Sequence, residues 1–302
     1  MAKKRRADSG AAGILLVDKP EGPTSFDVVA KLRSALGTRA IGHAGTLDPL
    51  ASGLLVVLVG PYTRLSQHLT AADKAYEALI TFGSRTTTDD REGDVVEEGD
   101  PSGIDDDVLR RALASMLGEQ DQVPPAYAAI SVEGERLYAR ARRGEQVEAP
   151  PRRITIHELT LERFSPPSAV VRVVCSKGTY VRAIARDLGS RLGVPAHLGG
   201  LRRTISGDYR VEDALGLAEL LEEGRAQEAL LRGPAAIRGV PLVEISEEDA
   251  RALEQGRGIP RPPSVGGAPD GSVLVAHAGD ALVAIVQARG GELRPSRGLG
   301  RC

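Results

Sequence analysis

The sequence predicts an α/β (α+β) fold over residues 12–233 and a small all-β module over residues 234–302. Up to about residue 233, short apolar runs suited to buried strands alternate with segments of helical spacing. Beyond it, short strand-like segments are separated by turns rich in Pro and Gly. Hydrophobic residues make up 41% of the chain, enough for a folded core, and residues 1–11 are expected to form a basic tail.

The first half of the chain is predicted to alternate strands and helices. An apolar run ending at Pro20 predicts a buried strand, and Thr24 with Asp27 three residues later is the capping-box pattern that opens a helix. A loop rich in Gly, His and Asp follows that helix. The predicted elements are a strand at 13–20, a helix at 24–36, a loop at 42–53, a strand at 54–59, a helix at 61–69, a strand at 75–82 and a helix at 105–117.

In the second half, alternating apolar and polar residues predict two paired strands, and the helix that follows has its apolar residues on one stripe. Cys175 is expected to be a small buried residue of the second strand. The predicted elements are strands at 154–164 and 169–176, a helix at 179–192, and short strands at 242–245, 271–276 and 281–288.

The net charge of −2, from 39 Lys and Arg against 41 Asp and Glu, argues against a protein that coats nucleic acid indiscriminately. The charges are nevertheless grouped in blocks. Residues 89–107 carry a net −9 and residues 212–254 a net −7, whereas 136–153 carry +4 and 172–210 carry +6. We expect the stretch 89–107 to be a solvated loop that leads into a helix. The basic blocks predict a polyanion-binding face on an otherwise acidic body.

The sequence gives no sign of a disulfide framework, a metal centre or a membrane span. Its two cysteines, Cys175 and Cys302, are too few for a framework, and no Cys/His cluster has zinc-ligand spacing. The charged N-terminus lacks the apolar segment of a signal peptide, and the longest apolar run, 54–59, is far too short to cross a bilayer. These features predict a cytoplasmic protein.

The most unusual segment of the chain is GHAGTLDPLASG at 42–53. No Gly-Lys-Ser/Thr follows, so it is not a P-loop, and it is not a dinucleotide fingerprint. Pro49 disfavours the α region at Asp48 and holds that residue extended. An acid fixed on such a loop could serve as a nucleophile or a base, and the alternative is that Asp48 only caps a turn.

A second segment, CSKGTYVR at 175–182, ends a predicted strand, turns at a glycine and opens a helix. Tyr180 and Arg182 would emerge at the N-terminus of that helix. An arginine is unfavourable there for the helix dipole, which favours a carboxylate or phosphate partner for it. The alternative is an ordinary surface arginine.

Together these segments resemble the TruB family of bacterial tRNA pseudouridine-55 synthases. The resemblance rests on five motifs that occur in order between about residues 12 and 210: GILLVDKPEGPTSFDVV at 13–29, GHAGTLDPLASGLL at 42–55, DKAYEA at 73–78, CSKGTYVRAIARDLG at 175–189 and HLGGLRRT at 197–204. It implies a pseudouridine-synthase fold with a mixed, mostly antiparallel sheet and a C-terminal PUA-like β-barrel. It also implies that a uridine in the T loop of tRNA is converted to pseudouridine without metal or cofactor.

The resemblance assigns catalytic roles to four residues. Asp48 matches the catalytic aspartate, a nucleophile, and Arg182 matches the arginine that pairs with it and keeps it ionised. Tyr76 matches the tyrosine that stacks on the target base, and Tyr180 matches a second active-site tyrosine. Asp90 aligns with a further acid of the family, but Thr87 stands where the family often has another aspartate, which leaves the role of that loop open.

The resemblance also implies residues that bind the substrate. His43 looks like the histidine that occupies space in the T loop when the nucleotide is flipped out. Leu201 is expected in the pocket wall, and Lys19, in the first motif, is expected to bind substrate. Residues 124–152 correspond to an inserted thumb that closes over the T stem, where phosphates would be contacted by Arg140, Arg142 and Arg143.

The expected partner is tRNA, through its T stem-loop and, through the C-terminal module, its acceptor stem. The chain is expected to act as a monomer, without an obligatory protein partner. Three alternatives remain open at this point. They are a pseudouridine synthase that modifies ribosomal RNA with a guide RNA, a non-catalytic tRNA binder or folding chaperone, and a phosphate-ester enzyme. The sequence contains no P-loop or metal-binding cluster that would support the last of these.

Overall fold

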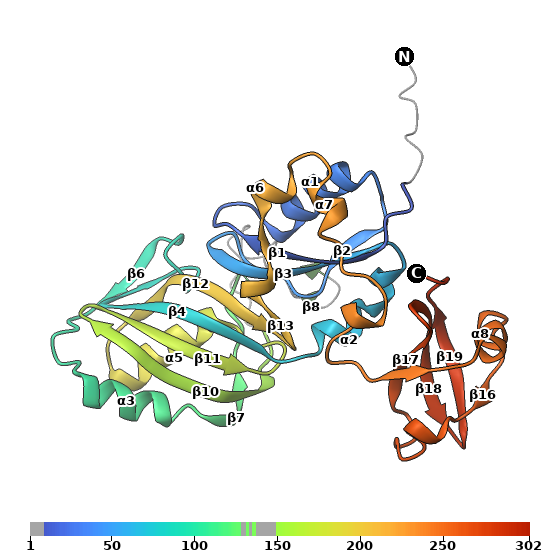
Figure 1. Cartoon of the computed structure of the whole chain (residues 1–302). Coiled ribbons are helices and arrows are strands. Elements are labelled where there is room, and N and C mark those ends of the chain that lie inside the picture. The colour runs from blue at the N-terminus through green and yellow to red at the C-terminus, as the bar shows by residue number, and fades with distance from the viewer. Residues whose placement is uncertain (1–8, 128–130, 133–134, 137–148) are drawn as a thin grey trace. The chain divides into compact units, whose positions relative to one another are not determined.

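The computed structural model describes residues 9–127, 131–132, 135–136 and 149–302 (Figure 1). The chain forms two compact units. The first unit comprises Met1–Pro49, Gly53–Ala72 and Ser206–Cys302, and the second comprises Leu50–Ser52 and Asp73–Ile205. The predicted boundary at residue 233 divides the chain by position in the sequence, whereas these two units group residues that contact one another in space.

The first unit contains a mixed group of strands whose bounds are β1 (Gly13–Lys19), β2 (Ile41–His43), β3 (Ala51–Val59) and β14 (Leu215–Gly216). β1 and β2 both run antiparallel to β3, and β14 runs parallel to β1. Helix α1 (Ser25–Leu36) begins after Thr24, whose hydroxyl and backbone form the predicted capping box with Asp27. It ends at Gly37, which adopts a left-handed φ of 62°.

Short elements complete the core part of this unit. The expected helix at 61–69 is a 3₁₀ turn followed by one α-helical turn. Two buried tyrosines fill this region: the Tyr62 hydroxyl accepts from the backbone N–H of Gly233 at 2.7 Å, and the Tyr209 hydroxyl donates to the carbonyl of Ala236 at 2.9 Å. The elements are η1 (Gly60–Leu65), α2 (Ser66–Thr70), β13 (Tyr209–Arg210), η2 (Val211–Asp213), α6 (Leu217–Leu220), α7 (Arg225–Glu228) and η3 (Pro234–Ala236).

The C-terminal part of the first unit is a five-stranded sheet in the order β15-β17-β18-β19-β16, which confirms the predicted strands, although the module is not all-β as expected. It also holds a helix that we did not expect, α8, whose Ser246 cap and acidic first turn suit a helix N-terminus and whose Leu253 packs into the module's core. The bounds are β15 (Leu242–Glu244), α8 (Glu247–Glu254), β16 (Ile259–Pro260), η4 (Pro263–Val265), β17 (Val273–Ala278), β18 (Ala281–Arg289) and β19 (Glu292–Gly298).

The second unit is built on strands in the order β12-β4-β11-β10-β7. The predicted hairpin of β10 and β11 is present, and the pairs β4–β11, β11–β10 and β10–β7 are all antiparallel. Two helices, α3 and α5, pack against each other and against this sheet (Figure 1). The bounds are β4 (Lys74–Phe82), α3 (Asp106–Ala114), β7 (Gly118–Gln122), β10 (Arg152–Ser165), β11 (Ser168–Cys175), α5 (Val181–Leu192) and β12 (Ala196–Ser206).

The expectation of a solvated loop at 89–107 is wrong for its first residues. β5 (Ser84–Thr86) pairs with β6 (Val95–Glu98), and the turn between them buries Asp89 and Asp90, which are 7% and 4% exposed. Ion pairs with arginines of α5 compensate the burial of both carboxylates. A further small pair is formed by β8 (Ser131–Val132) and β9 (Glu135–Arg136).

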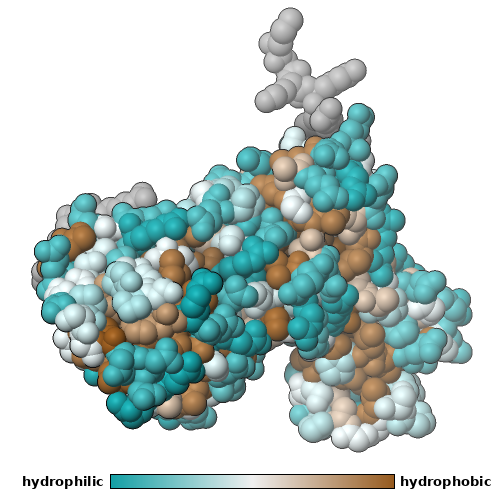
Figure 2. Space-filling view, turned by 60° about the vertical axis from the view of Figure 1, so that its left-hand side comes forward, coloured by the Kyte–Doolittle hydropathy of each residue, from teal (hydrophilic) through white to brown (hydrophobic). Residues whose placement is uncertain are grey.

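Figure 2 shows hydrophilic side chains over much of the visible face, with apolar side chains gathered in separate patches. Within the described part of the chain, none of the helices has the length and apolar character needed to cross a membrane.

Candidate active site

The loop that carries Asp48 is held on both sides of that residue. The buried hydroxyl of Ser25, at the start of α1, accepts from the backbone N–H of Leu47 at 2.8 Å and donates to its carbonyl at 3.0 Å. On the other side, the carbonyl of Pro49 accepts from the backbone N–H of Gly22 at 2.9 Å. Asp48 is therefore a half-buried carboxylate between two anchored neighbours, a geometry that restricts its motion.

Lys19 belongs to the same supporting structure. Its side chain is fully buried, and Nζ donates to the carbonyls of Pro20 at 2.9 Å and Pro23 at 2.8 Å, with Pro49 at 3.5 Å. The ammonium group thus ties the end of β1 to the residue that follows Asp48. A direct contact between Lys19 and the substrate stays a prediction.

His43 is the last residue of β2, at the entrance to the same loop. It is half-buried, and its carbonyl accepts from the Ser66 hydroxyl at 3.4 Å. Lys19, His43 and Asp48 thus all belong to the first unit and lie on its β1, β2 and β2–β3 loop. The three residues Leu50–Ser52 that come next in the chain belong to the second unit.

The second unit carries the other predicted site residues. Tyr76 lies on β4 opposite Val173 of β11 and is 9% exposed. Leu201 lies on β12, half-buried, and its carbonyl accepts from the Ser52 hydroxyl at 3.5 Å. Both are therefore on strands of the central sheet of that unit.

Tyr180 is the N-cap residue of α5, and a reciprocal amide contact fixes its backbone. The side-chain oxygen of Gln122 accepts from the N–H of Tyr180 at 2.8 Å, and the amide nitrogen of Gln122 donates to its carbonyl at 3.1 Å. The Arg152 guanidinium lies 5.9 Å from the centre of the Tyr180 ring, within the range of a cation–π contact. Gln122 is a supporting residue that no local sequence signal indicates.

Arg182, in the first turn of α5, is buried rather than on the surface, with only 6% exposure. Its guanidinium donates to the carbonyl of Thr88 at 3.1 Å and to that of Tyr127 at 3.2 Å. It also lies 3.5 Å from the carboxylate of Asp90. The expected carboxylate partner for this arginine is thus present as Asp90, and its pairing with Asp48 stays a prediction.

One turn further along α5, Arg186 makes a parallel set of contacts. It donates to the Asp89 carboxylate at 3.1 Å and to the carbonyl of Val123 at 2.9 Å. Burial raises the pKa of Asp89 above its ordinary value, and the charge and hydrogen bond of Arg186 oppose that rise. Nothing in the local sequence pattern singles out this pair.

Two buried cations lie on neighbouring strands of the second unit. Lys74 on β4 is 6% exposed and Arg203 on β12 is 1% exposed. Burial, with the charge of Arg203 second, lowers the pKa of Lys74 to about 8. Cys175 stands opposite Lys74 in the β4–β11 register, buried as predicted, and burial raises the pKa of its thiol to about 11.

The predicted thumb arginines, Arg140, Arg142 and Arg143, lie outside the described residues. In the described ranges there is no group of three or more His, Cys, Asp or Glu side chains placed to hold a metal ion. Taken unit by unit, the first unit offers an anchored carboxylate, and the second offers two tyrosines and a buried arginine. A carboxylate can act as a nucleophile, and a buried arginine can stabilise charge.

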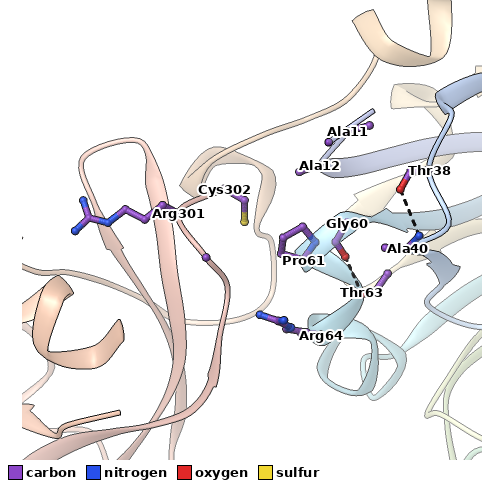
Figure 3. Close-up of a pocket in the computed structure, with 12 residues that line it drawn as sticks. Ala11, Ala12, Thr38, Ala40, Gly60, Pro61, Thr63, Arg64, Arg301 and Cys302 are labelled. Atoms are coloured by element: carbon purple, nitrogen blue, oxygen red, sulfur yellow. Dashed lines mark hydrogen bonds between the residues drawn. The ribbon is translucent and has the colours of Figure 1, made fainter. Parts of the chain in front are cut away.

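A hollow of about 530 Å³ in the first unit does not include any of the predicted site residues (Figure 3). Its hydroxyl groups are engaged locally: Thr38 accepts from the N–H of Ala40, and Thr63 donates to the carbonyl of Gly60. The Arg301 side chain pairs with carboxylates of α8.

Comparison with known protein families gives two adjoining matches. Residues 33–181 match the model of the TruB family pseudouridylate synthase N-terminal domain, and residues 182–233 match the tRNA pseudouridylate synthase B C-terminal domain.

Several curated proteins named tRNA pseudouridine synthase B are similar over most of their length. That of Corynebacterium efficiens is 47% identical over 82% of this chain and 84% of its own length. That of Thermobifida fusca is 45% identical over 87% and 93%, and that of an Arthrobacter species is 41% identical over 94% and 95%.

Solved structures show a similar fold at lower identity. An H/ACA ribonucleoprotein bound to a substrate RNA contains a chain that matches with a TM-score of 0.74 at 23% identity, over 99% of this chain and 91% of that one. A chain of an archaeal box H/ACA complex matches with a TM-score of 0.72 at 24% identity, over 97% and 88%.

Proposed function

Because the chain belongs to the TruB family of pseudouridylate synthases, we infer that it is a tRNA pseudouridine synthase, an isomerase that converts uridine 55 of the T loop to pseudouridine. The observation that carries this function is the 41–47% identity with tRNA pseudouridine synthases B over most of the chain. In this reaction the N1–C1′ bond breaks, the uracil rotates while bound, and C5 bonds to C1′. A proton leaves C5 and one is bound at N1, so the product is an isomer of the substrate.

We propose Asp48 as the catalytic nucleophile. Its carboxylate can add to an electrophilic carbon, either C6 of the uracil or C1′ of the ribose, or stabilise an oxocarbenium-like sugar as glycosidase carboxylates do. The anchored neighbours Leu47 and Pro49 support this role, because a nucleophile held in place loses little entropy on reaching the reacting carbon.

Arg182, Tyr76 and Tyr180 would complete the catalytic set. Arg182 would keep the nucleophile ionised and oriented through a charge-assisted hydrogen bond. Tyr76 would stack on the flipped uracil and assist proton transfer, and Tyr180 would line the same pocket. The burial of Arg182 supports this proposal, since a buried guanidinium acts in a low dielectric and is less screened by solvent.

The remaining residues would bind tRNA. Base flipping exposes the exchanged atoms, with His43 occupying the vacated space and Leu201 contributing to the pocket wall. The thumb would contact T-stem phosphates and the C-terminal module the acceptor stem, which makes binding salt-dependent. We propose that the protein acts in the cytoplasm as a monomer, without cofactor or obligatory partner. A bare T-stem-loop RNA should then suffice as substrate, which separates this function from guide-RNA-dependent modification.

The test is a comparison of Asp48→Asn with the wild-type protein on unmodified tRNA, with pseudouridine mapped by carbodiimide treatment and primer extension. Asp48→Asn should abolish the product while tRNA affinity stays close to wild type. Asp100→Asn, at an exposed aspartate that accepts from Ser102, is the matched control and should retain full activity. Absence of product at the T-loop uridine with wild-type protein would refute the function. Wild-type turnover by Asp48→Asn would refute the nucleophile, whereas tRNA binding by the wild-type protein without any product would favour a tRNA-binding chaperone.

A further inference from the structure

Two arginines of α5 bridge the same pair of chain segments. Arg182 and Arg186 are four residues apart and so lie on one face of the helix. Each sends one guanidinium nitrogen to the turn at 88–90 and the other to a backbone carbonyl at 123–127. For Arg182 the acceptors are Thr88 and Tyr127, and for Arg186 they are Asp89 and Val123.

The Arg186 bridge is partly shielded from water. The Asp89 side chain is 9% exposed and that of Arg186 is 20% exposed. This ion pair therefore differs from fully solvated ion pairs, which contribute little to the stability of a protein. The planar fork of an arginine can reach a carboxylate and a carbonyl at once, which the point charge of a lysine cannot reproduce.

The turn that Arg186 holds is closely defined. Asp89 adopts a left-handed φ of 58°, a conformation that Asp and Asn tolerate better than most residues. Its N–H donates to the carbonyl of Thr86 at 3.3 Å, and its carbonyl accepts from the N–H of Leu198 on β12 at 3.0 Å. The next residue is Asp90, whose carboxylate lies beside Arg182. A shift of Asp89 would therefore move the partner of the predicted catalytic arginine.

We propose that Asp89 and Arg186 are a positioning pair for the reaction: their ion pair fixes the turn against α5 and thereby sets the orientation of the Arg182 guanidinium. This inference rests on the proposed function, because it assigns the pair to the site that contains Arg182. Arg182 fixes the turn at one point, and Arg186 adds a second point one helical turn away. Two points prevent the turn from pivoting about the first.

The neighbouring Asp187 provides a matched control. It is also an ion-pair partner of Arg186, at 2.8 Å, but it lies on α5 itself and its side chain is 36% exposed. Replacing Asp187 by asparagine removes a negative charge beside the Arg186 guanidinium, but it leaves the ion pair between Arg186 and Asp89 in the turn intact. Asp89→Asn keeps the side-chain shape and suits the left-handed backbone, so it removes the charge without adding strain.

The experiment measures the single-turnover rate of pseudouridine formation on a T-stem-loop RNA, the Kd for that RNA, and the thermal midpoint. Asp89→Asn, Arg186→Lys and Arg186→Gln should each slow the single-turnover rate by at least about fivefold while Kd changes by less than about twofold. The double variant Asp89→Asn/Arg186→Gln should be no slower than the slower single variant, because both changes break one unit. Asp187→Asn should stay within about twofold of wild type.

Wild-type rates in Asp89→Asn and Arg186→Gln would overturn the inference, as would rate effects of the two changes that multiply in the double variant. A purely structural pair would lower the thermal midpoint and leave the rate of the folded protein unchanged, which would also overturn it. A wild-type protein that forms no pseudouridine would instead refute the proposed function, so the two failures are distinguishable.

Discussion

Replacing Ser25 by alanine should destabilise the protein because its hydroxyl is the partner of a buried peptide group. Ser25 is 2% exposed, and its hydroxyl makes two hydrogen bonds to the backbone of Leu47, which is 3% exposed. In Ser25→Ala both the N–H and the carbonyl of Leu47 lose this partner inside the protein.

The expected size of the effect follows from those two bonds. Leaving one buried polar backbone group unsatisfied costs about 1–3 kcal/mol, so two groups give a loss of about 2–6 kcal/mol in the free energy of unfolding. Leu47 precedes Asp48, and a loosened loop should also lower kcat, by roughly tenfold for a small displacement of the nucleophile. Affinity for tRNA should change little.

Urea unfolding followed by far-UV circular dichroism measures the effect, since the chain contains no Trp for fluorescence. The matched control is Ser115→Ala, which removes an exposed hydroxyl bonded to the carbonyl of Ala112 and should cost less than about 0.5 kcal/mol. If Ser25→Ala is as stable as Ser115→Ala and equally active, the anchoring of the Asp48 loop by Ser25 is refuted.

Three further changes test the supporting charges. Lys19→Met, which removes the buried ammonium from its backbone carbonyls, should lower the free energy of unfolding by about 1–3 kcal/mol in urea titrations, and unchanged stability would contradict that role. Lys74 has a pKa of about 8 in the folded protein against an ordinary 10.5, so between these values the unfolded chain binds a proton that the folded chain has lost. The stability of the wild-type protein relative to Lys74→Met should therefore rise between pH 8 and 10. A stability difference that does not change with pH would disprove the lowered pKa. Joint replacement by alanine of Arg140, Arg142 and Arg143 should weaken tRNA binding and reduce the slope of log affinity against log salt by roughly one per lost phosphate contact, whereas an unchanged slope would exclude those contacts.

Much of the fold could be predicted because its signals are local. The capping box of Thr24 and Asp27 lies within four residues, and the buried run of β3 is a contiguous stretch. β12 was missed because Arg202 and Arg203 interrupt its apolar pattern, although Arg203 is buried in the folded chain. The hairpin of β5 and β6 was missed because its exposed, acidic second strand lacks the alternation that marks a half-buried strand.

By itself, the sequence determined the family resemblance through its ordered motifs, and from these we predict the residues that carry the chemistry: an aspartate restricted by the proline that follows it and an arginine at a helix start. The tertiary structure decided what supports these residues. Ser25 reaches Leu47 across 22 positions, and Arg186 reaches Asp89 across 97. The tertiary structure also decided that the acidic stretch at 89–107 begins with two buried carboxylates, those of Asp89 and Asp90. The cost of burying a charge depends on the partner that meets it in space, and a partner this distant along the chain leaves no trace in the local pattern.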